Sequence, residues 1–317
     1  MYDVAALGEL LIDFTCLSTD ADGYPTMAAH PGGAPANYLA ALTKFGAKTA
    51  MIGKVGNDAF GRLLIKTLKG TGIDTRGMLV SDDVFTTLAF VTLDDSGNRE
   101  FSFARKPGAD TQLRFDEIDL GVIDASKVLH FGTLSMTNEP ARDATYKAVE
   151  YAAGRGKLIS FDPNLRKPLW NDLDEAKRQM LWGLRHADVV KISDEETEFL
   201  FGLAPEEAAK HIIDSFGVRL VYVTCGADGC FCRTKTASGF VKALSGIAVK
   251  DTTGAGDIFG GSSMYGLLKA GGVPEKLTAE ELKEIVSFAC ASAGLSTTRA
   301  GGISSVPELG EVEAVMK

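Results

Sequence analysis

Short apolar segments alternate with helical patterns along most of this chain. From about residue 34 onward, runs rich in Val and Ile are separated by stretches in which apolar residues recur at helical spacing. The predicted strands are residues 4–7, 49–53, 128–131, 158–162, 189–192 and 220–224. The predicted helices are residues 35–45, 60–69, 140–155, 173–185 and 204–216. Buried strands joined by helices of this length are typical of a mostly parallel sheet covered by helices.

Two segments, 11–33 and 84–110, break this alternation. In the second segment, residues 85–93 and 99–103 flank a turn at 94–98, which is the pattern of a β-hairpin. We expect the two segments to pair as a small separate sheet that covers a ligand site as a lid.

Residues 229–234 and 237–243 have the pattern of an antiparallel hairpin at the edge of the main sheet. The sequence therefore predicts a three-layer α/β/α fold with a mostly parallel central sheet and a small β-sheet lid. The predicted main domain comprises residues 1–10, 34–83 and 111–317, and the predicted lid comprises residues 11–33 and 84–110. Ligands bind beyond the carboxyl ends of the strands in open sheets of this class, so we expect the chemistry to gather there.

Composition narrows the class of protein. Of the 317 residues, 45% are hydrophobic and 24% are charged, as in soluble globular enzymes, and the net charge of -9 argues against a nucleic-acid-binding surface. The five cysteines are odd in number and lack metal-ligand spacing, so we expect neither disulfides nor a zinc site. No stretch is long and apolar enough to span a membrane, and no basic leader precedes residues 4–7, which predicts a cytoplasmic protein.

The segment 251–257 reads Asp-Thr-Thr-Gly-Ala-Gly-Asp and precedes a predicted helix at 258–268. Gly254 and Gly256 leave the backbone open to close approach by a phosphate, and the N–H groups of a first helical turn have no partner within the helix. The helix dipole favours an anion there by roughly 0.3–1 kcal/mol. We expect this turn to stabilise developing negative charge.

Asp257 would repel a bound phosphate, so simple anion binding does not account for it. If a substrate hydroxyl lies between Asp257 and a terminal phosphate, the carboxylate can take its proton while the turn stabilises the transferred group. The structural alternative is an Asp that caps its own helix beside a tight glycine turn. The length of the motif favours phosphoryl transfer. The chain has no Gly-x-x-x-x-Gly-Lys-Ser/Thr string and no Gly-x-Gly-x-x-Gly after the first strand, so neither a P-loop fold nor a dinucleotide fold is supported.

Two further groups of polar residues are typical of a sugar site. Asp13 follows the first strand, and the turn at Gly32 and Gly33 leads to Asn37, so a carboxylate and an amide are available to vicinal hydroxyls. Structural roles for Asp13 in a turn and Asn37 in a cap are the alternative. Further candidates for sugar or phosphate oxygens, each able instead to form a surface ion pair or hydrogen bond, are Asn164 and Arg166 after a strand and Arg105 and Lys106 after the lid hairpin.

A second set of residues has the pattern of a nucleotide and metal site. Ser193 and Glu196 begin a helix after a strand, where they form either a capping box or a water-mediated magnesium site. Thr224, Gly226 and Gly229 belong to a loop that either contacts a nucleotide or is a plain turn. Lys191, in the strand before Ser193, is another candidate for binding the nucleotide.

Taken together, these residues resemble the ribokinase-like, or phosphofructokinase-B, family of carbohydrate kinases over essentially the whole chain. Its two signature regions are matched by residues 32–37, with Gly46 and Gly56 downstream, and by residues 251–261. The resemblance implies an ATP-dependent phosphotransferase that acts on a sugar hydroxyl.

The resemblance also implies roles for individual residues. Asp257 is then the catalytic base, and the anion hole is formed by Gly254, Ala255 and Gly256. The sugar would face Asp13, Gly33, Asn37 and Arg105, and the nucleotide would face Thr224, Gly226 and Gly229. Glu196 would hold Mg²⁺ through water, although Ser193 stands where the family has the Asn of its Asn-x-x-Glu motif. A potassium-like cation would bind at Asp251 and the Thr253 carbonyl, beside a second loop within 298–302.

The substrate and assembly follow from the same resemblance. Residues 8–14, 106–110 and 161–170 are most similar to bacterial fructokinases, which implies phosphorylation of D-fructose at its 6-hydroxyl. A 2-keto-3-deoxygluconate kinase is the alternative, because Arg105, Lys106 and Arg166 could bind an acidic sugar; a ribokinase is third. An inactive sugar sensor is disfavoured by the retained Asp257. The apolar face of a small lid sheet predicts a homodimer, with no nucleic-acid or membrane partner.

Overall fold

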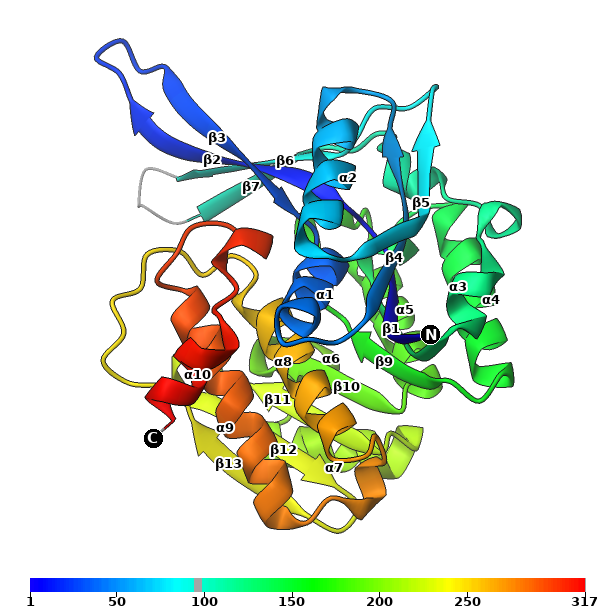
Figure 1. The fold of residues 1–317 in the computed structure, drawn as a ribbon, viewed down its shortest axis with the longest axis vertical. Helices are drawn as coiled ribbons and strands as arrows, with labels where there is room; N and C mark the ends of the chain where they lie inside the picture. Colours follow the sequence, from blue (N-terminus) through cyan, green and yellow to red (C-terminus); the bar gives the residue numbers. More distant parts are fainter. Residues whose placement is uncertain (94–98, 317) are drawn as a thin grey trace.

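A large sheet forms the middle layer of the protein (Figure 1). The computed structural model describes residues 1–93 and 99–316. Within these residues nine strands pair in the order β13-β12-β11-β10-β9-β8-β1-β4-β5. Their bounds are β1 Tyr2–Leu7, β4 Thr49–Gly56, β5 Asp74–Ser81, β8 Ser126–Gly132, β9 Leu158–Asp162, β10 Val189–Ser193, β11 Leu220–Thr224, β12 Gly229–Thr234 and β13 Ser238–Lys242. The pairs from β5 to β11 are parallel, and β12 and β13 form the predicted antiparallel hairpin.

Helices cover both faces of this sheet, which confirms the predicted three-layer fold. One face is covered by α1 Ala34–Lys44, α2 Ala59–Thr71, α8 Ala255–Lys269, α9 Ala279–Ser296 and α10 Leu309–Val315. The other face is covered by α3 Leu120–Asp124, α4 Ala141–Gly154, α5 Leu173–His186, α6 Asp194–Phe201 and α7 Pro205–Phe216. Successive side chains of a strand point to opposite faces, so Val4 and Ala6 of β1 join one hydrophobic core while Ala5 and Leu7 join the other.

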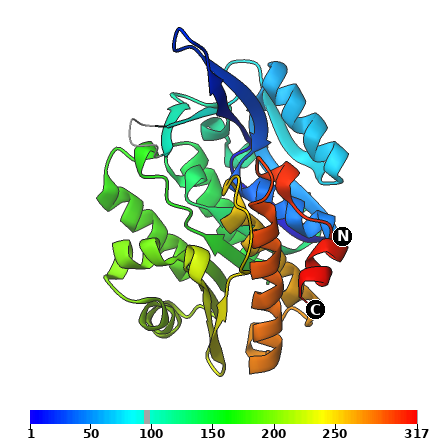
Figure 2. The ribbon, with the colours of Figure 1, turned by 90° about the vertical axis from the view of Figure 1, so that its left-hand side faces the viewer.

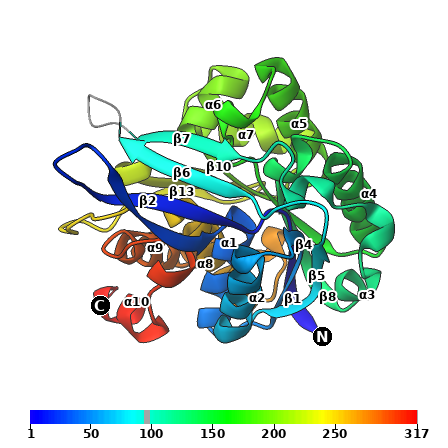
Figure 3. The ribbon, with the colours of Figure 1, turned by 90° about the horizontal axis from the view of Figure 1, so that it is seen from above.

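A second, four-stranded sheet lies at one end of the molecule (Figures 1 and 2). It consists of β2 Leu11–Thr19, β3 Pro25–Gly32, β6 Leu88–Leu93 and β7 Arg99–Ala104, in the order β3-β2-β6-β7. The β2–β3 and β6–β7 pairs are antiparallel, whereas β2 and β6 run parallel, as Figure 3 shows from above. The segments predicted to form a small sheet therefore do so; the predicted turn at 94–98 lies outside the described residues.

The sequence pattern does not predict β5 or α9. β5 is the outer strand of the large sheet, and most of its residues are only partly buried, so it lacks a continuous apolar run. In α9, small residues such as Ala291, Ala293 and Gly294 dilute the apolar periodicity. α9 has 18 residues, but neither it nor any other helix in the described part of the chain is apolar enough to cross a bilayer.

Candidate active site

The turn before α8 is built for close backbone approach. Gly254 is the N-cap residue and has a φ of 76°, and a Cβ added to it would lie only 3.0 Å from the Gly302 Cα. A side chain at this position is therefore both strained and crowded. Ala255, Gly256 and Asp257 form the first turn of α8, where N–H groups point toward the helix N-terminus. The Ala255 N–H makes a long bond of 3.3 Å to the Thr252 carbonyl oxygen.

Asp257 is held by two amide side chains. Its Oδ2 accepts a hydrogen bond from Asn37 Nδ2 at 2.9 Å, and its Oδ1 accepts one from Asn164 Nδ2 at 3.1 Å. Burial raises the pKa of Asp257, while the Asn37 hydrogen bond, the charges of Lys191 and Arg166, and the Asn164 hydrogen bond lower it. The structure thus brings a buried, oriented carboxylate directly beside the glycine turn, an arrangement suited to a general base.

Asp13 belongs to β2 of the small sheet, and Asn37 belongs to α1. Burial raises the pKa of the Asp13 carboxyl to about 7, and the charges of Arg166, Asp257 and Asp251 also act on it. Gly32 ends β3 and Gly33 precedes α1, which carries Asn37. The buried Asn37 Oδ1 has no hydrogen-bond partner among the described residues, so it can accept a bond from a ligand hydroxyl.

The loop after β9 contributes Asn164 and Arg166. Asn164 has a φ of 45°, a left-handed conformation that Asn tolerates better than most residues, and its N–H donates to Asp162 Oδ1 at 3.1 Å. This turn aims the Asn164 amide at Asp257. Arg166 lines the same cavity as Asp257.

Lys191 supplies positive charge beneath the glycine turn. Its Nζ lies 3.1 Å from Asp162 Oδ2, and a Cβ added to Gly256 would lie 3.1 Å from the same Nζ. Burial lowers the pKa of Lys191, but Asp162, Glu196 and Asp257 raise it by more, so the net shift is upward. The ammonium group therefore stays protonated next to the predicted phosphate site.

Ser193 and Glu196 form the capping box that was one of two predicted roles. Ser193 Oγ accepts the Glu196 N–H at 3.2 Å, and Glu196 Oε2 accepts the Ser193 N–H at 2.8 Å. Glu196 Oε1 also accepts the Leu165 N–H at 2.7 Å, which ties α6 to the loop that carries Asn164. Glu196 nevertheless lines the cavity of Asp257.

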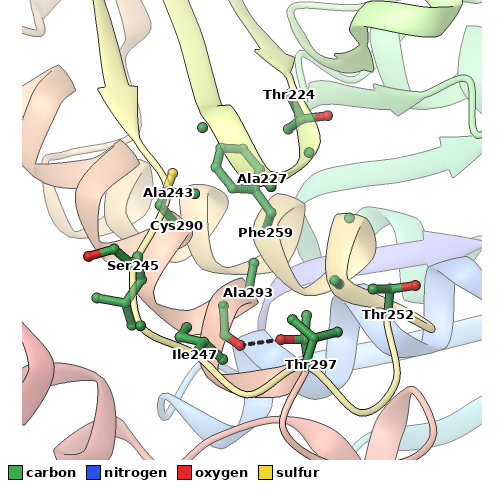
Figure 4. Close-up of a pocket in the computed structure, with 18 residues that line it drawn as sticks. Thr224, Ala227, Ala243, Ser245, Ile247, Thr252, Phe259, Cys290, Ala293 and Thr297 are labelled. Carbon is green, nitrogen blue, oxygen red and sulfur yellow. Dashed lines mark hydrogen bonds between the residues drawn. The ribbon is translucent and has the colours of Figure 1, made fainter.

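Two cavities meet at the glycine turn. The first, of about 500 Å³, is mainly apolar and is lined by Thr224, Gly226, Gly229, Phe259 and residues of α9 (Figure 4). The second, of about 370 Å³, contains the polar residues Asn164, Arg166, Lys191, Glu196 and Asp257. The cavities share Thr224, Gly226, Thr252 and Gly256. An elongated ligand with an apolar end and a phosphate end could therefore span both.

Asp251 joins the two loops predicted to bind a monovalent cation. Its Oδ1 accepts hydrogen bonds from the N–H and Oγ1 of Thr253 at 2.9 Å and 2.7 Å. Its Oδ2 accepts the Gly301 N–H at 2.9 Å. The loop at 251–253 thus lies directly against the loop that contains Gly301.

Arg105, predicted to face the sugar, does not line the cavity that contains Asp257, and neither does the candidate Lys106. The Arg105 side chain is 2% exposed and pairs with Asp110 Oδ2 at 2.7 Å. It lines a separate cavity of about 590 Å³, together with Lys106, Gln112 and Asn138. The sequence offered no signal for this, because Asp110 has no periodic or motif relation that marks it as the partner of Arg105.

Sequence reasoning also missed the wall that α9 contributes to the apolar cavity. Cys290, Ala293, Gly294 and Thr297 line it, and Phe259 of α8 faces them (Figure 4). The available signal was the run of small residues in α9, which leaves space beside a helix. The run alone does not show that this space belongs to the cavity, because that depends on how α9 packs against α8.

Comparison with known proteins gives a consistent result. The profile described as pfkB family carbohydrate kinase matches residues 1–309. The chain is 40% identical to probable fructokinase-4 of Arabidopsis thaliana, over 99% of this chain and 96% of that protein. The structure of fructokinase with bound ATP from Xylella fastidiosa has a TM-score of 0.91, is 30% identical and covers 100% of this chain and 98% of that chain. A fructokinase double mutant from Vibrio cholerae, bound to fructose, ADP and a potassium ion, has a TM-score of 0.87 at 30% identity and covers 100% of this chain and 99% of that chain.

Proposed function

This chain belongs to the pfkB family of carbohydrate kinases, and we propose that it is a fructokinase, which transfers the γ-phosphoryl group of ATP to the 6-hydroxyl of D-fructose. The products are fructose 6-phosphate and ADP. The observation that carries the proposal is the Asp257 carboxylate, oriented by Asn37 and Asn164 beside the glycine turn of α8. Relatives named fructokinase that are about 40% identical over the whole chain support fructose as the sugar.

The site supports an in-line transfer with Asp257 as the general base. Asp257 takes the proton of the 6-hydroxyl as that oxygen forms a bond to the γ-phosphorus, and the bond to the β-phosphate bridging oxygen breaks to release ADP. The backbone at Gly254, Ala255 and Gly256 forms the anion hole for the transferred group. Asp13, Gly32, Gly33, Asn37, Asn164 and Arg166 surround the sugar.

The apolar cavity suits the base and ribose of ATP. Gly229 lines it, Thr224 and Gly226 line it where it joins the polar cavity, and Lys191 lines the polar cavity. A nucleotide placed along both cavities brings its terminal phosphate to the turn at Gly256. The positive charge of Lys191 then offsets phosphate charge that the acidic chain would otherwise repel.

The donor set near Glu196 fits Mg²⁺ bound with the nucleotide. No cluster of three His, Cys, Asp or Glu side chains that could hold a metal occurs within residues 1–93 and 99–316. Both Glu196 oxygens accept backbone N–H groups, so Glu196 can reach a magnesium ion through coordinated water rather than directly. When bound, Mg²⁺ neutralises phosphate charge.

Loop oxygens at Asp251 and Thr253, next to the loop of Gly301, fit a potassium ion as activator. The potassium ion in the Vibrio cholerae structure supports this assignment. K⁺ would add positive charge near the anion hole. Replacing K⁺ by a large organic cation such as tetramethylammonium should then lower kcat, and unchanged turnover would remove potassium from the proposal.

The small sheet is assigned to a lid, formed by residues 11–33 and 84–110, that closes on the main domain of residues 1–10, 34–83 and 111–317. Leu17 and Tyr24, 66% and 70% exposed on this sheet and its turn, are suited to contact with a second copy in a homodimer. Light scattering of the wild type and Leu17→Asp tests this, since a dimer that dissociates in the variant is expected.

The five free cysteines fit a reducing compartment such as the cytoplasm.

The deciding experiment measures ATP-dependent ADP release with fructose, ribose and 2-keto-3-deoxygluconate. Preferred turnover of fructose is expected, because the Arg105 charge is paired with Asp110 and so does not attract the carboxylate of an acidic sugar. Preference for the acidic sugar would reassign the substrate, and the absence of turnover with detectable sugar binding would indicate a sensor.

A further inference from the structure

All four connections between the small sheet and the rest of the protein meet at one buried polar cluster. Glu9 precedes β2, Thr87 precedes β6 and Arg105 follows β7. Asp110 lies in the short 3-10 helix Ala109–Gln112 that comes after β7. These four residues, here called the root cluster, are each at most 5% exposed. The fourth connection, from β3 to α1, joins the cluster through the Ala34 N–H, which donates to Glu9 Oε1 at 2.8 Å.

Hydrogen bonds to the Asp110 carboxylate join three members of the root cluster, Thr87, Arg105 and Asp110. Arg105 Nε donates to Asp110 Oδ2 at 2.8 Å, and Thr87 Oγ1 donates to Asp110 Oδ1 at 2.5 Å. The same guanidinium donates to Thr137 Oγ1 at 2.7 Å and to the Leu134 carbonyl at 2.8 Å. Burial and the charge of Asp110 raise the pKa of Glu9 to about 7, and the charge of Arg105 lowers it, so all three ionisable groups interact. The cluster therefore fixes the base of the small sheet against the main domain.

Glu9 also contacts the turn that leads to Asn37. Gly33 has a φ of 115°, and a Cβ added to it would lie 2.5 Å from the Glu9 carbonyl oxygen. Ala34, whose N–H binds the Glu9 carboxyl, is the first residue of α1. One turn later, Asn37 donates to Asp257 Oδ2 at 2.9 Å. A displacement of Glu9 would thus be passed along α1 to the base.

We propose that Glu9 and Arg105 are positioning residues for the sugar, because the root cluster sets the small sheet, which carries Asp13, and the start of α1, which carries Asn37, relative to Asp257. In this role Arg105 does not touch the substrate. Its guanidinium faces Asp110, Thr137 and Leu134, and its side chain is 2% exposed.

The inference rests on the proposed fructokinase activity, so wild-type turnover of fructose is measured first. The variants are Glu9→Ala, Glu9→Gln, Arg105→Lys, Asp110→Asn and the double variant of the last two. Arg114→Lys is the matched control, since Arg114 pairs with Asp116 at 3.0 Å on the surface. For each protein, KM for fructose, KM for ATP, the Kd of fructose by calorimetry and the unfolding midpoint are determined.

We expect Glu9→Ala, Arg105→Lys and Asp110→Asn to raise KM and Kd for fructose by about 10- to 100-fold, the scale of a misplacement of roughly 1 Å, with KM for ATP within about twofold. Glu9→Gln retains an oxygen for the Ala34 N–H and should restore most of the affinity lost in Glu9→Ala. The Arg105 and Asp110 effects should not add in the double variant, since either change breaks the same pair.

Two results would overturn the inference. If Arg105→Lys weakens fructose binding while Asp110→Asn binds it like the wild type, Arg105 contacts the sugar directly. If the variants lose only thermal stability and their folded fraction keeps the wild-type KM, the root cluster is structural alone. A wild type without fructose turnover would instead contradict the proposed function, which separates the two failures.

Discussion

At the scale of single residues, the site is defined by one buried carboxylate and the groups that surround it. Asp257 is 7% exposed, and its two oxygens bind amides from Asn37 and Asn164, which lie far away in the sequence. Each amide donates one hydrogen bond and neither can take up a proton, so both orient the carboxylate without replacing it as a base. Burial, which raises its pKa, makes it a better proton acceptor than a surface carboxylate.

Asp257→Asn should remove the base while keeping the shape of the side chain. We expect kcat to fall by about 100- to 10,000-fold, the usual scale for a general base, with the Kd values of ATP and fructose little changed. Rapid-mixing or steady-state assays give kcat, and calorimetry gives both Kd values. Asp116→Asn, at an exposed position, is the control. Turnover retained in Asp257→Asn would exclude Asp257 as the base.

The raised pKa of Asp13 predicts how sugar recognition depends on pH. The Asp13 carboxyl has a pKa of about 7, so it becomes ionised, and a stronger hydrogen-bond acceptor, as pH rises from 6 to 8. We expect kcat/KM for fructose to increase as pH rises through this range and to decrease as pH falls below it. In Asp13→Asn the rise near pH 7 should disappear, leaving only the ionisation of Asp257. A variant profile identical in shape to the wild type would contradict the assignment.

At the scale of elements, helix starts supply most of the site. α8 presents its first turn to the polar cavity, α1 presents Asn37, and α6 begins with the capping box of Ser193 and Glu196. Because Glu196 Oε1 also binds the Leu165 N–H, the cap of α6 fixes the loop that aims Asn164 at Asp257. One carboxylate therefore stabilises a helix and lines the polar cavity that contains Asp257.

The capping and magnesium roles of Glu196 can be separated with Glu196→Ala and a matched variant, Glu281→Ala. Glu281 forms the corresponding capping box with Thr278 at the start of α9. Loss of either cap should lower the free energy of unfolding by about 0.5–2 kcal/mol, measured in urea. Only Glu196→Ala should also raise the Mg²⁺ concentration needed for half-maximal activity. Equal magnesium requirements in the two variants would show that Glu196 caps the helix and has no role in binding magnesium.

At the scale of the whole molecule, the site is an assembly of loops from one edge of the large sheet and the small sheet beside it. Asp162, Ser193 and Thr224 end three adjacent parallel strands, β9, β10 and β11, so the loops that follow them open at the same edge. The small sheet, at the end of the molecule seen in Figure 2, adds Asp13. The root cluster joins these two parts, and Glu9 is a buried acid within it.

Glu9 should make folding stability depend on pH. Its folded pKa of about 7 lies above its ordinary value of 4.5, so the folded state holds the proton more tightly, and that stabilisation is complete below pH 4.5 and is lost as pH rises through about 7. Glu9→Gln cannot titrate. The free energy of unfolding of Glu9→Gln minus that of the wild type should therefore increase by on the order of 2–3 kcal/mol between pH 5 and pH 8.5. A constant difference across these pH values would show that Glu9 is not a buried titrating group.

The sequence by itself determined the features that depend on neighbouring residues or on periodicity. The alternation of apolar and helical segments predicted the three-layer fold, and the contiguous turn at Gly254 with Asp257 predicted phosphoryl transfer, because a turn and the helix it starts are local structures. The tertiary structure alone decided that Asn164 bonds to Asp257, that Arg105 pairs with Asp110 away from that site, and that α9 lines the apolar cavity. These contacts depend on how elements pack and on which charges share a buried space, and neither is encoded in the spacing of residues along the chain.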